Sequence, residues 1–160
     1  MRHNIVRSIV GIRRLRWGKT RLAEAMDANR PSIEFAFPGA LRDRLIAAIQ
    51  SGSKTSPSSL MREYEVGDDP LLIVGHRGAV VDSDGERVFL IETTVVKFVR
   101  LCDVPLEHAL AENEGNLSVA DWRANHTDFW SSDLMRAELS TGFELGDDSL
   151  VVLEQFVVLR

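Results

Sequence analysis

The most regular spacing of apolar residues lies in residues 40–50, ALRDRLIAAIQ. Its apolar positions recur at the spacing that places side chains on one face of a helix. These positions are Leu41, Leu45, Ala48 and Ile49. Gly52 follows the pattern, and glycine suits the left-handed residue that ends many helices. We therefore predict a helix over residues 40–50, followed by a polar loop, SGSKTSPSSL, at residues 51–60.

Two later segments are dense in β-branched and aromatic residues, which favour strands. The first is RVFLIETTVVKFVRL at residues 87–101; it is too long for one flat strand, so we predict a bend or bulge within it. The second, SLVVLEQFVVL at residues 149–159, predicts another strand. Asp84 and Gly85 together mark a hairpin turn before the first of these segments. Shorter apolar runs lie within residues 70–82.

Two helices are predicted between these strand segments. Pro105 can open the first, PLEHALAENEG, and Gly115 can close it. Ser118 begins the second, SVADWRANHTDFW, as an N-cap with Asp121 three residues on. The apolar positions of the second helix are Trp122, His126, Phe129 and Trp130. We interpret this stripe as an aromatic core face, in which His126 is either a hydrogen-bonded neighbour or a ligand contact.

The resulting order is helix, strands, two helices and a strand. Strands and helices do not alternate regularly, so a doubly wound parallel sheet is not predicted. We predict an α+β fold, a small mixed β-barrel with flanking helices. The 160 residues are 44% apolar and 27% charged, which is typical of one globular domain.

Cysteine and histidine usage limits the chemistry. The single cysteine, Cys102, excludes an internal disulfide and fits a reducing cytoplasm. The histidines lack metal-ligand spacing, so we predict neither a metal nor another cofactor. No apolar run reaches the length of a transmembrane helix, so we predict no membrane partner.

The net charge of −5 is distributed unevenly along the chain. Residues 1–31 hold eight basic and two acidic side chains, a net charge of +6, so the remainder carries −11. An acidic body of this kind does not attract duplex nucleic acid as a whole, so any RNA contact must be local. We interpret residues 1–31 as an N-terminal extension that is flexible or results from an early start codon. A nucleic-acid-binding arm and a targeting peptide remain as alternatives.

Four segments resemble, in order, the motifs of the ASCH domain family (activating-signal cointegrator homology), which has a PUA-like fold. Residues 34–55 resemble the family's opening, which ends in Gly-x-Lys-Thr. Residues 80–96 resemble its central hairpin, and residues 112–130 its acidic Glu-x-Glu-Gly block followed by Trp-Arg-x-x-His. Residues 153–159 resemble its closing strand. We assign residues 32–160 to this domain.

The resemblance implies a cleft in which the Gly-x-Lys-Thr loop faces the acidic block, and it implies RNA, a nucleotide or a nucleobase as the ligand. Some members resemble amidohydrolases that act on N4-acetylcytidine through a Lys, a Thr three residues later and a Glu, and others cut RNA. Lys54 and Glu114 match the Lys and the Glu, but Pro57 stands at the threonine position. Because proline has no hydroxyl, that mechanism does not carry over intact.

The candidate catalytic residues are therefore Lys54 and Glu114. Lys54 is either a solvated loop lysine or a cation that contacts the ligand, and Glu114 is either its structural partner or a proton-transfer group. Glu112 is the competing acid. Hydroxyls of the loop can cap the backbone, contact the ligand or replace the missing threonine. The candidate ligand-binding residues are Lys54, Thr55, Ser56, Ser58, Tyr64, Glu112, Arg123 and His126.

Three functions are compatible with these residues. The first is a binding module for RNA or a small nucleotide or nucleobase ligand. The second is a hydrolase, acting on N4-acylated cytidine or on RNA, with Lys54 as the base and Glu114 as the acid or orienting group. The third is a regulatory protein that uses the fold as an interaction surface. Fold alone does not decide among them.

Overall fold

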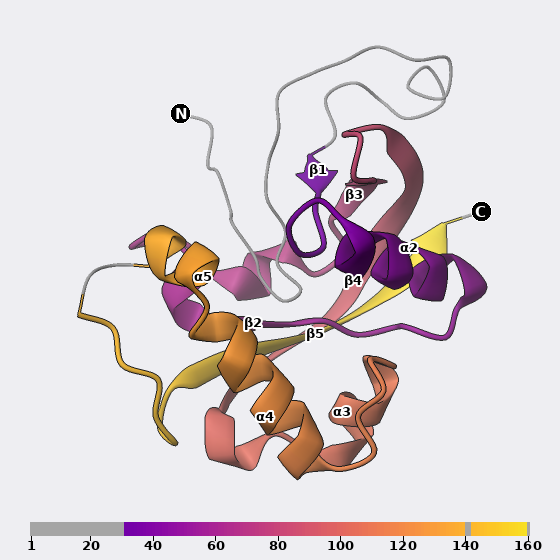
Figure 1. The fold of residues 1–160 in the computed structure, drawn as a ribbon. Helices are drawn as coiled ribbons and strands as arrows, with labels where there is room; N and C mark the ends of the chain where they lie inside the picture. Colours follow the sequence, from indigo (N-terminus) through magenta and orange to yellow (C-terminus); the bar gives the residue numbers. More distant parts are fainter. Residues whose placement is uncertain (1–30, 140–141, 160) are drawn as a thin grey trace.

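The computed structural model describes residues 31–139 and 142–159, which form one sheet with helices against it (Figure 1). The strands are β1 (Ser32–Ile33), β2 (Ser58–Leu60), β3 (Arg77–Val81), β4 (Arg87–Arg100) and β5 (Leu150–Leu159). The α-helices are α2 (Ala40–Ser51), α3 (Leu106–Ala111), α4 (Val119–Trp130) and α5 (Asp133–Glu138). Three short 3₁₀ helices are η1 (Met61–Glu63), η2 (Pro70–Ile73) and η3 (Leu101–Asp103). The prediction for residues 1–31 falls outside the described residues, apart from Pro31.

The sheet has the strand order β1-β3-β4-β5-β2. β1 pairs with β3 in parallel, and the other pairs are antiparallel. The predicted α+β fold is confirmed, although the sheet does not close into a barrel and ends at the short strands β1 and β2. The predicted irregularity in the long strand is also confirmed, because the β4–β5 register shifts between Thr93 and Val95.

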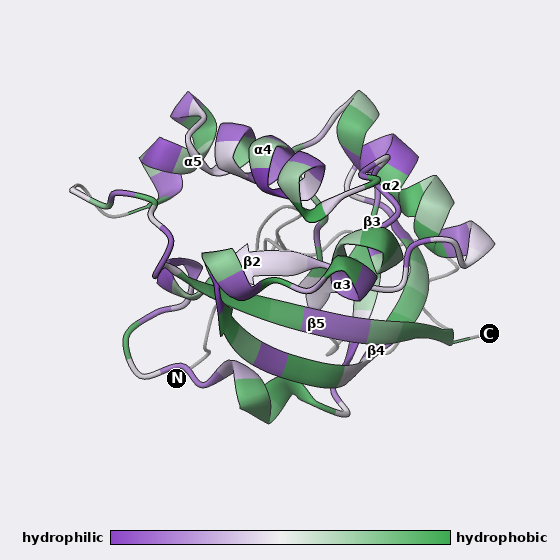
Figure 2. Cartoon of the chain, turned by 90° about the horizontal axis from the view of Figure 1, so that it is seen from below, coloured by the Kyte–Doolittle hydropathy of each residue, from purple (hydrophilic) through white to green (hydrophobic). Residues whose placement is uncertain are grey.

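The helices cover one side of the long β4–β5 ribbon, as Figure 2 shows for α2, α4 and α5. The side chains of α2 pack with β1, β3 and β4 in one apolar cluster, which includes Ile49 and Phe35. The aromatic side chains of α4, Trp122 and Trp130, pack with β2 and β5 in a second cluster. Tyr64 belongs to a third cluster with residues of η2, β4 and β5.

The predicted helix ends agree with the structure in two places. Gly52 caps α2 in the left-handed conformation with φ of 79°, and its backbone N–H donates to carbonyls of the last turn. The Ser118 side chain accepts a hydrogen bond from the backbone N–H of Asp121 and so caps α4. Both caps border the candidate site, because the Lys54 loop follows the first and the acidic block precedes the second.

Gly78 brings β1 and β3 close together, so substituting alanine there is expected to lower the free energy of unfolding by about 1–3 kcal/mol, a typical cost of overpacking. A Cβ atom at this position would lie 2.2 Å from Cδ1 and 2.5 Å from Cγ1 of the buried Ile33. Urea unfolding of Gly78→Ala measures this cost. Gly146→Ala is the matched control, because a Cβ atom there meets nothing within 4 Å. Equal stabilities of the two variants would contradict the expected clash.

Candidate functional site

The segment that carries Lys54 runs alongside β5 before β2 formally begins. The backbone carbonyl of Thr55 accepts a hydrogen bond from Phe156 N (3.0 Å), and that of Pro57 accepts one from Glu154 N (3.1 Å). Side chains alternate between the two faces of an extended segment. Ser58 accordingly contacts the acidic block on one face, and its neighbour Ser59 contacts Tyr64 on the other.

Lys54 joins the loop to the acidic block. Its side chain is 0% exposed, and its Nζ donates to the backbone carbonyl of Glu112 (3.1 Å) and to Glu114 Oε1 (2.7 Å). The backbone N–H of Thr55 also donates to the carbonyl of Ala111 (3.0 Å). The two motifs thus meet through both side-chain and backbone contacts.

The turn after α3 gives the two glutamates their different directions. Asn113 adopts a left-handed conformation with φ of 50°, and Gly115 does so with φ of 88°. Asparagine tolerates this conformation better than most residues with a side chain, so it serves here without a glycine. As a result Glu112 is buried, whereas the side chain of Glu114 is 15% exposed beside Lys54.

Glu112 is the centre of a buried polar cluster. Its Oε1 accepts hydrogen bonds from Trp122 Nε1 (3.0 Å) and from the Ser58 hydroxyl. The same oxygen lies 3.1 Å from His108 Nε2, which is itself 2.9 Å from Ser58 Oγ. Ser58, His108 and Trp122 therefore all converge on one carboxylate oxygen.

The second oxygen of Glu112 faces His126. The two atoms, Glu112 Oε2 and His126 Nε2, lie 3.1 Å apart without the alignment of a hydrogen bond. The other ring nitrogen of His126, Nδ1, is 2.9 Å from the Trp122 carbonyl, which can only accept, so Nδ1 carries a proton. The remaining ring nitrogen, Nε2, faces the Glu112 carboxylate.

The two glutamates have opposite pKa shifts. Burial alone would raise the pKa of Glu112, but the electrostatic attraction of His126, the close contact of His108 and the charge of Lys54 outweigh that effect and hold the pKa well below its usual value. Burial raises the pKa of Glu114, and the attraction of Lys54 does not cancel that effect. Glu112 is therefore held as an anion, while Glu114 binds a proton more readily.

Residues 32–160 match the family model described as the ASCH domain. This chain belongs to the ASCH domain family. A search of curated proteins found no significant match.

Two solved structures resemble this ASCH domain. The ASCH domain from Lactobacillus crispatus JV V101 is 28% identical, with a TM-score of 0.69, over 88% of this chain and 86% of that one. A protein from Enterococcus faecalis V583 is 24% identical, with a TM-score of 0.66, over 79% of this chain and 74% of that one. The second likeness supports the fold alone.

The candidate residues of this ASCH domain fall into two groups. The first group surrounds the contact between the loop and the acidic block and consists of Lys54, Thr55, Ser58, Glu112, Glu114 and His126. Tyr64 lies on the other face of β2, where its hydroxyl is 3.2 Å from Ser59 Oγ and 3.3 Å from Glu154 Oε1. Arg123 forms an ion pair with Asp147 in the loop before β5, so the structure does not bring it to Lys54. Ser56 is buried, and no hydrogen-bond partner for its hydroxyl lies among the described residues.

Sequence reasoning missed His108, which contacts both Ser58 and Glu112. The available signal was its position on α3 four residues before Glu112, the C-cap of that helix, since residues at this spacing are neighbours on a helix. Within residues 31–139 and 142–159, no three His, Cys, Asp or Glu side chains are arranged to hold a metal ion. None of the helices in those ranges has both the length and the apolar character needed to cross a bilayer.

Proposed function

We propose that this ASCH domain binds a small nucleotide, a nucleobase or the end of an RNA strand at the Lys54–Glu114 pair. The observation that carries the proposal is the buried ammonium of Lys54. A lysine ammonium has three N–H donors, and among the described residues Lys54 Nζ has two hydrogen-bond acceptors, Glu112 O and Glu114 Oε1. A phosphate or carbonyl oxygen of a ligand would supply the third.

A nearby polar atom supports the same interpretation. The Ser56 hydroxyl is buried without a hydrogen-bond partner among the described residues. Each unsatisfied buried polar group costs about 1–3 kcal/mol. Ser56 lies two residues after Lys54, so its unsatisfied hydroxyl favours a site that a polar ligand or water completes.

The surroundings set the direction of approach. The Glu114 side chain reaches the surface, and the adjoining residues Thr55, Asn113 and Gly115 are exposed. Since residues 32–160 are acidic as a whole, electrostatic attraction of the ligand is local to Lys54. A small ligand or a single RNA end fits this restriction better than a duplex.

Calorimetric titration with cytidine monophosphate, uridine monophosphate and a short single-stranded RNA tests the proposal. Lys54→Met is expected to weaken binding at least about tenfold, because a hydrogen bond to a charged group contributes about 1.5–3 kcal/mol. Lys97→Met is the matched control, since Lys97 is an exposed lysine on β4. Equal affinities of Lys54→Met and the wild-type protein would exclude Lys54 as the ligand contact.

A hydrolase is the second candidate, favoured by one observation. The Ser58 hydroxyl lies between His108 and Glu112, which is the arrangement of a nucleophile beside a base. Against it, no described hydroxyl forms a hydrogen bond with Lys54 Nζ. Release of cytidine from N4-acetylcytidine, present in the wild-type protein and lost in Ser58→Ala, would favour the hydrolase over a binding module. The same assay with a short RNA tests ribonuclease activity.

A further inference from the structure

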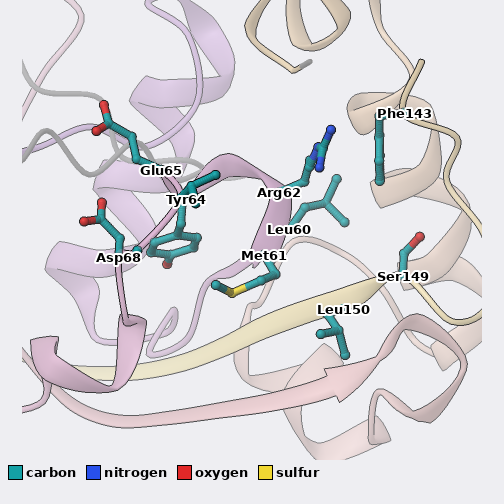
Figure 3. A pocket seen from close by; sticks show the side chains of 11 residues that line it. Leu60, Met61, Arg62, Tyr64, Glu65, Asp68, Phe143, Ser149 and Leu150 are labelled. Carbon is teal, nitrogen blue, oxygen red and sulfur yellow. The ribbon is translucent and has the colours of Figure 1, made fainter. Parts of the chain in front are cut away.

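A second concave surface lies away from Lys54, between η1 and the loop that precedes β5 (Figure 3). We call it the η1 groove; its volume is about 390 Å³. Its apolar lining comes from Leu60, Met61, Tyr64, Val66, Phe143 and Leu150. Figure 3 shows Glu65 and Asp68 together on one side of the groove and Arg62 on the other, beside Phe143. The residues that line the η1 groove do not include Lys54, Ser58, Glu112 or Glu114, so the groove is distinct from the Lys54 site.

The η1 groove is both apolar and acidic. Val66 is completely exposed, at 108% of its reference area, and Leu150 is half exposed. The charged residues that line the groove are Arg62, Glu65 and Asp68, a net charge of −1. Two further acids, Glu63 and Asp69, belong to the same segment of the chain. A partner that matches this surface has apolar side chains among positive charges. RNA has the wrong charge for it.

We propose that the η1 groove binds the chain's own N-terminal segment, residues 1–30. This segment contains eight basic and two acidic residues, so its charge of +6 opposes that of the groove. Its apolar residues are interspersed among the arginines and can enter the groove while the arginines meet the acidic side. These apolar residues include Ile5, Ile9, Ile12 and Leu15.

The N-terminal segment is long enough to reach the groove. The described chain begins at Pro31, and Ser32 of β1 pairs with Ala79, which pairs with Leu90, which pairs with Leu159. β1 therefore lies level with the end of β5 that is farther from the groove. From β1 to the groove the distance is about 30 Å along β5 and about 14 Å across the sheet. Residues 16–30 can extend to about 50 Å, so residues 5–15 can reach the η1 groove from this starting point.

Disulfide formation in the full chain tests this placement. In a Cys102→Ser background, which removes the single native thiol, Ile12→Cys is combined with Val66→Cys in the groove. The control combines Ile12→Cys with Leu117→Cys, because Leu117 is 83% exposed and does not line the groove. Docking raises the effective concentration of the first pair, so we expect its intramolecular disulfide to form at least about tenfold faster.

Charge reversal provides a second measurement. Glu65→Lys with Asp68→Lys is expected to slow the Ile12–Val66 disulfide at least about threefold, and Arg13→Glu with Arg14→Glu is expected to restore the rate. Equal rates for the groove and control pairs would overturn the proposal. Disulfide-linked dimers whose formation falls on dilution would also overturn it, because they would identify a second copy of the chain as the occupant.

Discussion

Replacing Glu112 by alanine is expected to lower the free energy of unfolding by about 3–5 kcal/mol at pH 7, the usual cost of breaking a buried charged pair. The carboxylate is fully buried and accepts from Trp122 Nε1 and Ser58 Oγ. Its removal leaves both donors, and the side chains of His108 and His126, without their acceptor. A group that loses its partner inside the protein bears the full desolvation cost.

Urea unfolding at pH 7 measures the effect of Glu112→Ala. Glu107→Ala is the matched control, because Glu107 is an exposed acid on the same helix, α3. Surface substitutions of that kind usually change stability by no more than about 0.5 kcal/mol. If the two variants were equally stable, the cluster around Glu112 would not contribute to the fold, and its polar atoms would be held for the ligand alone.

The long periodic segments were predicted from the sequence because their local preferences agree with their tertiary environment. Residues 40–50 form α2, and residues 149–159 form β5 with one residue fewer. The predicted strand at 87–101 became β4 and includes the expected irregularity. In these segments the apolar positions that favour one element also pack against the core, so local and global signals coincide.

The polar segment 54–60 was harder to predict, because its serines suggested a solvated loop. Instead, Lys54, Ser56, Ser58 and Ser59 are all buried, and Ser58–Leu60 forms β2. Pairing with β5 and contacts with the acidic block decide this structure, and both depend on residues that are distant in sequence. Tertiary interactions of this kind override local propensity.

The candidate site was predicted in part. The resemblance to the family implied that the loop faces the acidic block, and the Lys54–Glu114 contact agrees with that arrangement. It did not imply that Glu112 would lie deeper, at the centre of a cluster with two histidines. Glu112 and Glu114 are two residues apart, and the left-handed turn at Asn113 decides which of them points inward. No periodic pattern in the sequence marks that turn.

Arg42 illustrates the same limit outside the site. The sequence places it on an ordinary helix, yet its guanidinium is buried, with hydrogen bonds to the carbonyls of Phe35, Ala36 and Asp82. It also forms a 2.6 Å ion pair with Glu34. An arginine with four such contacts fixes the chain before α2, but its role emerges only when residues 34–36 and 82 come together around it.

Acid is expected to destabilise the wild-type protein more than its Glu112→Gln variant. The folded protein holds the pKa of Glu112 well below its usual value, and the unfolded value is about 4.3. The stabilisation from ionised Glu112 is therefore fully present above about pH 4.3 and is lost as the pH falls through the folded pKa. Glutamine does not titrate, so the stability advantage of the wild-type protein should shrink below about pH 4.

Glu114 is expected to show the opposite dependence, because its folded pKa is raised. Its contribution is greatest below its unfolded pKa of about 4.3 and declines as the pH rises through the higher folded value. Urea unfolding between pH 3 and about 8 measures the free energy of unfolding of the wild-type protein and of each variant. The difference between the wild-type protein and Glu112→Gln should rise with pH, whereas the difference between the wild-type protein and Glu114→Gln should fall. Parallel pH profiles for the two variants would mean that the paired glutamates do not have distinct protonation roles. Opposite slopes would identify Glu112 as a fixed anion inside the protein and Glu114, beside Lys54, as the carboxyl that exchanges a proton.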